Sequence, residues 1–597
     1  MLTQKARSRV DGKPRTRGNG TRKAAHRVTT ALFVEEALVQ VSHHQQEWER
    51  GVLRARLARG QERPLTTRTG SGDIPIKRTY TPLDIAGTDY AQDIGMPGGY
   101  PFTRGADPIM YRGMEWPAYF YAGYGSSEDA NAYYKDLIAK GATHVSLALD
   151  LPSQVGYDAD HPAARGDVGK SGVALNSLRD LELILDGIPL EKITTGTVGN
   201  CIGPIMLAMF IVLGEKRGVP IEQMHVHLQN DPLKEYTGRG TYIIPVRPAV
   251  DLAADMVSYA LRHAPRWTSQ YVCATQIRWG GATAVQEAAF GLAHVLAYVE
   301  AARSKGVPLE EYVPRIDLHM TVDNDLFEEV AKYRAVRRLW ARMAQERFGT
   351  DDPRVLCLKT TTYTAGHRMT AQEPLNNVVR TTVHVLAAFL GGTHSIHAPA
   401  YDEALALPTP ESARLAQMTQ QLLFYESGAC SVVDPLAGSY YVEWLTSEIE
   451  KRARAYLKKI EALGGAIGAI EKGYIQREMA EWAYRYQKEV QSGERPVIGV
   501  NKFSLDKPIE IKTFRHNPEA ERRQIERLRQ LRVERDNARV QECLRHVKET
   551  AIRKRSNPNA ENIVGPILEC VRAYGTIGEI CDVLREVYGE YVPPSFN

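Results

Sequence analysis

Two short runs, ITTGTV at residues 193–198 and HVHLQ at residues 225–229, decide the fold. Each is rich in β-branched or apolar residues and has the length of a buried strand. Residues 205–213 between them read IMLAMFIVL, which is typical of a buried helix, and residues 249–261 form a second helical stretch after the second run. The order strand, helix, strand, helix favours a parallel sheet with helical crossovers.

The same order repeats through the middle of the chain. We predict further strands at residues 143–149, 271–278, 316–322 and 355–361, and further helices at 178–185 and 381–390. The repeat suits a (β/α)8 barrel, the TIM-barrel fold, over residues 79–437. In that fold the catalytic residues lie at the C-terminal ends of the strands. The residues predicted to lie there are Gln229, Gln276, Asp317 and 360–362.

The composition changes on both sides of the predicted barrel. Residues 438–597 are expected to form a helical C-terminal region, with long charged helices at 443–488 and 515–556. Residues 31–78 are expected to form a helical arm and a linker, because apolar residues recur at three-to-four spacing from Phe33 to Leu57. That arm packs either on a partner or on the core of its own chain, and the sequence leaves both open.

The N-terminal tail, residues 1–30, is basic and is expected to be disordered. Residues 1–28 contain nine Lys or Arg and one Asp, with almost no aliphatic periodicity. Such a tail is either an organelle presequence, a nucleic-acid arm or a solvated extension. We favour the solvated extension, because the tail has no apolar stripe that would dock or insert.

Composition excludes several classes of protein. The 597 residues are 43% hydrophobic and 24% charged, with a net charge of only +4, as expected of a globular protein. The seven cysteines are scattered and none forms a CxxC pair, so we expect no metal site and a reduced, cytoplasmic protein. We expect no membrane span, because no window approaches 18 apolar residues. Charges alternate in sign over residues 519–555, which favours a solvated helix face over nucleic-acid binding.

Four motifs underlie the functional prediction. QNDPLKE at residues 229–235 leads to Arg239 and to TYIIP at 241–245, and the others are GYPFTRG at 99–105, GYDADHP at 156–162 and NNVVRT at 376–381. Arg239 is a permanent cation that can hold a carboxylate with two parallel hydrogen bonds. Together the motifs resemble the large subunit of the methylmalonyl-CoA mutase family, over roughly residues 75–595. That family rearranges carbon skeletons of acyl thioesters with adenosylcobalamin.

The resemblance implies roles for particular residues. Tyr121 matches a tyrosine that lies against the adenosyl group and the substrate, although an aromatic run is otherwise usually core. Arg239 matches an arginine found in members that act on dicarboxylic acyl groups, where members with other substrates usually have glutamine. It therefore implies a methylmalonyl-like or succinyl-like substrate. A salt bridge between Arg239 and Glu235 at i, i+4 is the alternative.

Other positions follow from the same register. The resemblance assigns Gln229 and Arg315 to the substrate and its thioester arm, and Glu403 to the adenosyl ribose. It also gives two further sets: Ser146 and Tyr363 at the substrate, and Leu149, Ser171, Gly238 and Trp279 at the cofactor. Each of these side chains is otherwise an ordinary polar or packing residue.

The chain departs from the family pattern inside the site. Gln276 replaces a histidine that donates to the thioester carbonyl, and it donates a neutral hydrogen bond but is no acid near neutral pH. Trp279 replaces a glutamate that meets the corrin ring, and it either stacks on that ring or clashes with it. Tyr363 replaces a glutamine. The segment that grips coenzyme A in the family has lost its basic and hydroxyl residues, and this chain has Asp107, Ile109, Met114, Pro117 and Tyr119 there.

Three interpretations follow from these departures. The chain is a mutase with a changed acyl-CoA substrate, a mutase whose acyl group is attached to a carrier protein, or a noncatalytic barrel that stabilises an active subunit. The family's cobalamin motif, Asp-x-His-x-x-Gly, does not occur in the sequence. We therefore expect a separate small subunit to hold the cofactor in a hetero-oligomer, and the resemblance suggests a metallochaperone GTPase as a further partner.

Overall fold

The computed structural model describes residues 30–60, 68–113, 116, 119–268, 270–507, 509–514, 517 and 519–595, with backbone alone for 119–122. Nearly all of the predicted basic tail, residues 1–29, lies outside the described residues. No helix in the described part of the chain is both long enough and apolar enough to cross a bilayer.

In the part of the chain that the structure describes, eight parallel strands form two four-stranded sheets. The first sheet has the order β1 (Tyr119–Ala122), β2 (His144–Leu147), β3 (Thr194–Val198) and β4 (Val226–Gln229). The second has the order β5 (Gln270–Cys273), β6 (Ile316–Val322), β7 (Lys359–Thr364) and β8 (Ile396–His397). The strands follow one another in chain order, so the predicted parallel α/β class is confirmed.

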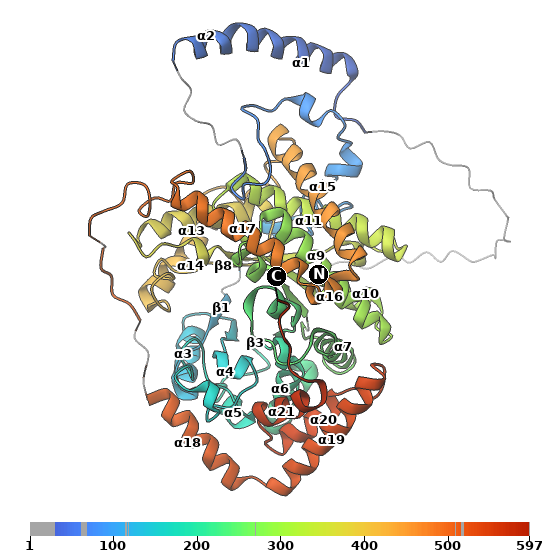
Figure 1. Ribbon diagram of the computed structural model, residues 1–597, viewed down its shortest axis with the longest axis vertical. Coiled ribbons are helices and arrows are strands. Elements are labelled where there is room, and N and C mark those ends of the chain that lie inside the picture. The colour runs from blue at the N-terminus through green and yellow to red at the C-terminus, as the bar shows by residue number, and fades with distance from the viewer. Residues whose placement is uncertain are drawn as a thin grey trace, which may run out of the picture.

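Helices connect the strands and cover the outside of the sheets (Figure 1). The longer ones are α3 (Ser127–Ala139), α5 (Leu178–Ile184), α6 (Gly203–Arg217), α7 (Val246–His263), α9 (Ala284–Ser304), α11 (Leu326–Phe348), α13 (Asn376–Gly391) and α14 (Pro410–Tyr425). Helix α6 is buried from Gly203 to Gly214, because its sequence is apolar all round. The two sheets meet at β4 and β5, where the backbone N–H of Leu228 donates to the carbonyl of Thr268 at 2.9 Å.

The predicted strand at 271–278 is partly wrong. The strand ends at Cys273, and residues Thr275–Trp279 form a short helix, α8. The prediction at 355–361 is displaced for a related reason. Pro353 occupies the first turn of helix α12 (Pro353–Leu356), and Asp352 caps it by accepting from the N–H of Arg354 at 2.9 Å, so β7 begins later.

Helices on both flanks pack around the strands. Helix α15 (Tyr440–Ala462) lies along α11 and α9, and α16 (Gly465–Glu471) and α17 (Tyr474–Gln491) continue from it. The last helices are α18 (Glu519–Glu534), α19 (Asn537–Ser556), α20 (Val564–Arg572) and α21 (Ile577–Tyr588), and α20 packs on α6. Near the N-terminus, α1 (Glu35–Trp48), the π-helical turn η1 (Glu49–Leu53) and α2 (Arg54–Ala58) stand away from the body and bury no residue (Figure 1).

Candidate functional site

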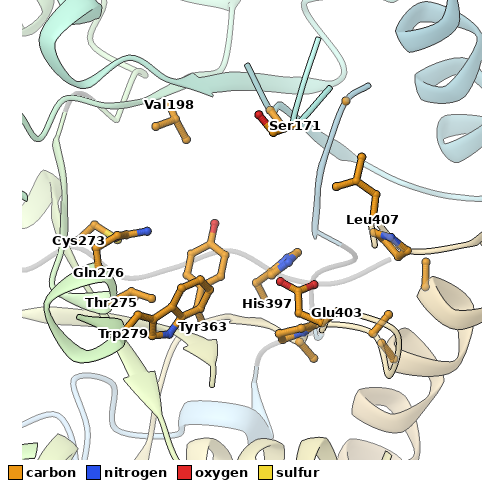
Figure 2. Close-up of a pocket in the computed structure, with 18 of the residues that line it drawn as sticks. Ser171, Val198, Cys273, Thr275, Gln276, Trp279, Tyr363, His397, Glu403 and Leu407 are labelled. Atoms are coloured by element: carbon orange, nitrogen blue, oxygen red, sulfur yellow. The ribbon is translucent and has the colours of Figure 1, made fainter. Parts of the chain in front are cut away.

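A cavity of about 570 Å³ opens at the C-terminal ends of the strands. Its wall takes Val198 from β3, Gln229 from β4, Cys273 from β5, Tyr363 from β7 and His397 from β8. Figure 2 shows Val198, Cys273, Tyr363 and His397 around a common space, with Trp279 at one end and Leu407 at the other. A cavity of this volume accommodates a small organic ligand.

Arg239 enters the cavity from the π-helical turn η8 (Glu235–Arg239), directly after β4. Its Nη1 lies 3.9 Å from Oε1 of Glu235, so the i, i+4 pair exists but is too long for a hydrogen bond. Glu235 is fully buried and has other partners: the side chains of Asn200 and Thr241, and Nζ of Lys234 at 3.6 Å. Since these partners satisfy Glu235, that carboxylate does not hold the guanidinium of Arg239, and Arg239 lines the cavity.

The turn between β4 and η8 is fixed by a buried carboxylate. Asp231 accepts from the hydroxyl of Tyr298 at 2.6 Å and from the backbone N–H of Cys273 at 2.6 Å. Burial raises the pKa of Asp231 to about 6, although nearby Lys234 opposes the shift. The bond from Cys273 ties the turn after β4 to the end of β5, and the bond from Tyr298 ties the same turn to α9. Gln229 and Cys273 both stand on the cavity wall.

Helix α8 presents Gln276 to the cavity. The side-chain Oε1 of Gln276 accepts from Sγ of Cys273 at 2.8 Å, so its amide nitrogen is the group left to donate to a ligand. Gly238 explains why α8 lies so close to η8. A Cβ built on Gly238 would lie 2.6 Å from the carbonyl oxygen of Gln276, so only glycine fits there.

Trp279 lies on the cavity wall without filling the space. It ends α8, and its ring centroid lies 5.9 Å from that of His367. Its indole N–H is buried and has no hydrogen-bond partner, although such groups are usually satisfied. The wall of the cavity therefore has an unused hydrogen-bond donor.

Glu403 faces the cavity from the turn after β8 (Figure 2). Its surface opens to the cavity, and burial, together with the charge of Asp402, raises the pKa of Glu403 to about 7. Ser171 lies on the opposite wall, in a segment whose position is fixed by the neighbouring Gly172. A Cβ on Gly172 would lie 2.3 Å from the carbonyl carbon of Leu149, so this segment packs directly on the backbone at Leu149.

The sequence-predicted residues fall into two groups. Those that line the cavity are Gln229, Gly238, Arg239, Gln276, Trp279, Tyr363, Glu403 and Ser171. Three others do not: Ser146 is buried within β2, Leu149 is buried in the core, and Arg315 stands before β6, at the opposite end of the strands. Tyr121 belongs to β1, but its side chain lies outside the described residues.

Sequence reasoning missed several wall residues. Lys234 is almost fully buried, and it belongs to the motif that includes Gln229 and Glu235, so its place in that motif is a signal that could have found it. Helix α14 contributes an amide-rich wall with Gln417, Gln420 and Gln421, which its sequence does not distinguish from an ordinary surface helix. Among the described residues, no group of three His, Cys, Asp or Glu could hold a metal ion.

Comparison with known proteins assigns a family. The profile of the methylmalonyl-CoA mutase family matches residues 69–590. The 2-hydroxyisobutanoyl-CoA mutase large subunit of Aquincola tertiaricarbonis is 40% identical over 553 residues, which is 92% of this chain and 97% of that protein. The methylmalonyl-CoA mutase large subunit of Streptomyces virginiae is 40% identical over 520 residues, covering 87% of this chain and 70% of that protein.

A third relative extends the same similarity. The methylmalonyl-CoA mutase of Escherichia coli is 38% identical over 554 residues, covering 92% of this chain and 76% of that protein. The match spans both sheets, the cavity and the C-terminal helices. The chain therefore belongs to the methylmalonyl-CoA mutase family of adenosylcobalamin-dependent carbon-skeleton mutases.

Proposed function

We propose that this mutase acts on an acyl thioester that bears a free carboxylate, of the methylmalonyl or succinyl type. The observation that supports the proposal is Arg239, whose guanidinium borders the cavity while Glu235 is satisfied by other groups. A partly buried guanidinium with unused donors favours a planar anion that accepts two hydrogen bonds. Overall identity does not decide the substrate, since relatives named for different acyl groups are each 40% identical.

The cavity also has groups that suit the cofactor. Glu403 offers a carboxylate to ribose hydroxyls, and the unpartnered indole N–H of Trp279 suits an amide oxygen of a corrin side chain. Ser171 and Gly238 also line the cavity, and their small size allows close approach. When bound, adenosylcobalamin would supply the radical chemistry of the rearrangement.

The chain's own residues position and shield the substrate. Arg239 would hold the carboxylate, and the amide nitrogen of Gln276 would donate to the thioester carbonyl. Because Gln276 cannot transfer a proton near pH 7, this contact orients and polarises the carbonyl without acid catalysis. Tyr363 and Trp279 place apolar surface beside the reacting group, which keeps water out. We propose that Tyr121 completes this wall from β1.

The assembly is part of the same proposal. We propose that β1 and β8 come together so that residues 79–437 close into an eight-stranded barrel, flanked by the helical arm at 31–78 and by the helical region at 438–597. A separate small subunit would supply the cobalamin-binding domain, and a metallochaperone GTPase would be a further partner. A cytoplasmic location is supported by seven cysteines that are all free thiols.

Replacement of Arg239 tests the proposal. Arg239→Gln removes the charge but keeps a donor, so kcat/KM for methylmalonyl and succinyl thioesters should fall by about tenfold to a hundredfold, the equivalent of a lost charge-assisted bond. The exposed Arg266→Gln is the matched control and should leave kcat/KM unchanged. If Arg239→Gln turns over the dicarboxylic substrates as well as the parent does, the carboxylate role is wrong.

A further inference from the structure

One buried carboxylate stands between two cations of the cavity wall. Oε1 of Glu235 lies 3.6 Å from Nζ of Lys234 and 3.9 Å from Nη1 of Arg239. Both distances are too long for a hydrogen bond, but they are short enough for a strong attraction between charges that water does not screen. Lys234 and Arg239 both line the cavity, so two groups that border the same space share the charge of Glu235.

Neutral donors hold the carboxylate of Glu235 in place. The side chains of Asn200 and Thr241 donate to it, and the backbone N–H of Thr241 donates to Oε2 at 3.2 Å. These bonds fix the position of the carboxylate but add no opposing charge. Because the side chain of Glu235 is fully buried, its negative charge has to be balanced by Lys234 or by Arg239.

Lys234 is placed to give this balance. Only 1% of its side chain is exposed, compared with 23% for Arg239. Its backbone N–H donates to Oδ1 of Asp231 at 3.4 Å, which holds the residue on the turn after β4. Within the described residues, Glu235 is the only carboxylate that lies less than 4.0 Å from the ammonium. The charge of Lys234 is therefore directed at Glu235.

Removal of the Lys234 charge would change the state of Arg239. Arg239 would then be the nearest cation to a buried carboxylate. It stands four residues after Glu235 on the turn η8, a spacing at which side chains meet. Its partly exposed guanidinium needs to move by only about 1 Å to form a hydrogen bond with Oε1. The guanidinium would then be held against Glu235 and withdrawn from the cavity.

We propose that Lys234 sets the acyl specificity without touching the substrate. It balances the charge of Glu235 and so leaves the charge of Arg239 for the carboxylate of the acyl group. A chain with a neutral residue at this position should lose its preference for carboxylate-bearing thioesters and bind neutral acyl thioesters as before. Lys234 is thus a positioning residue, and this inference rests on the proposed role of Arg239.

Arginine-selective modification of the full-length chain tests the charge balance without turnover. Phenylglyoxal would be added to the parent, to Lys234→Met and to Lys234→Met/Glu235→Gln, and the adduct at Arg239 measured by peptide mass spectrometry. At an exposure that modifies Arg239 fully in the parent, Lys234→Met should lose most of the adduct, because Glu235 then holds the guanidinium. The double variant has no carboxylate at this position and should regain the adduct. Lys458→Met, at an exposed position of α15, is the control and should react as the parent does.

Equilibrium binding connects the charge balance to specificity. Pantetheine thioesters of succinate and of butyrate are matched ligands with and without a carboxylate, and calorimetry measures their binding to the chain. In Lys234→Met the Kd of the succinyl thioester should rise by about tenfold to a hundredfold, the equivalent of one lost charge-assisted hydrogen bond. The Kd of the butyryl thioester should not change. Thermal melting checks folding, and Lys234→Gln, which keeps a donor but no charge, gives the same prediction where Lys234→Met does not fold.

Two results would overturn the inference. Equal modification of Arg239 in Lys234→Met and in the parent would show that Lys234 does not keep the guanidinium away from Glu235. An adduct that stays lost in the double variant would show that Lys234 acts on the fold of η8 and not through Glu235. Failure of the proposed function gives a different pattern. If the adduct follows the prediction but the parent binds both thioesters equally well, the carboxylate role of Arg239 is wrong, and the specificity role of Lys234 with it, while the charge balance stands.

Discussion

At the scale of single residues, the site depends on what stands next to each functional side chain. Arg239 is available because Glu235 is bound by Asn200, Thr241 and Lys234. Gln276 is placed because Gly238 lets α8 rest on η8. The sequence identified the wall residues Arg239 and Gln276, but not these supports, since neither the distance between Lys234 and Glu235 nor the contact under α8 follows from spacing.

Gly238→Ala tests that support. The added methyl would meet the carbonyl oxygen of Gln276, so we expect the free energy of unfolding to fall by about 1–3 kcal/mol, as in an overpacked core. Urea denaturation measures this loss. Gly565→Ala in α20 is the control, because a Cβ there meets nothing within 4 Å and alanine favours a helix. A Gly238→Ala chain as stable as the parent would mean that α8 moves freely over η8.

Glu403 predicts a pH dependence. Its raised pKa of about 7 lies above the usual value, so the stability that its protonated form contributes is present at low pH and is lost as pH rises through about 7. The ionised form is the better acceptor for ribose hydroxyls, so adenosylcobalamin binding in the assembled complex should strengthen from pH 6 to pH 8. Absorbance titrations would follow binding. Glu403→Gln should flatten the profile, and a variant that keeps the parent profile would contradict this assignment.

At the scale of elements, buried charges hold the helices behind the cavity. Lys332 of α11 contacts Glu287 of α9 at 2.5 Å and Glu329 at 2.5 Å, and all three side chains are fully buried. The backbone N–H of Thr321 in β6 donates to Glu287 at 2.6 Å, so the cluster joins both helices to a strand. Such a cluster fixes β6, which lies between β5 and β7, the strands from which Cys273 and Tyr363 reach the cavity.

Lys332→Met should therefore be strongly destabilising. It leaves Glu287 buried without its cation and leaves Glu329 with Arg278 alone, at 3.3 Å, which costs about 3–5 kcal/mol in the free energy of unfolding. The exposed Arg454→Met, which breaks a surface pair with Glu346 at 2.9 Å, should cost less than about 1 kcal/mol. Chemical denaturation of both variants measures the two losses in the free energy of unfolding. Equal losses would show that the buried cluster contributes no more than a surface pair.

Prediction of secondary structure from the sequence succeeded where a single periodicity extended over the whole segment. The run at 316–322 is strand β6 as predicted, because apolar residues alternate with Asp317, His319 and Thr321 along its whole length. It failed at 271–278, where a strand changes into α8 without Gly or Pro to mark the boundary. The contacts among the rings of His227, Tyr271 and His319 could not be predicted, because these rings meet only through the register of strands that are far apart in sequence.

At the scale of the whole molecule, the C-terminal helices brace the first sheet. Asp158, in the motif GYDADHP, accepts from the hydroxyl of Thr576 at 2.6 Å and from the N–H of Gly578 at 2.9 Å, and it pairs with Arg532 at 2.8 Å. The motif GYDADHP, which contributes to the family resemblance, thus anchors α18 and α21, and Asp158 itself does not line the cavity. Sequence resemblance predicted the family, and the order of strands and helices predicted the parallel α/β class, while the closed barrel and the partner subunit remain proposals.

The central claim is that this chain rearranges a carboxylate-bearing acyl thioester with a cobalamin-binding partner. Carbon-13 NMR on the assembled complex with adenosylcobalamin tests it most directly, with labelled methylmalonyl thioesters of coenzyme A and of a carrier protein. We predict that the label moves from the branched to the linear skeleton for at least one carrier, and that Arg239→Gln abolishes most of this conversion. Rearrangement of a 2-hydroxyacyl thioester with no conversion of either methylmalonyl thioester would contradict the account.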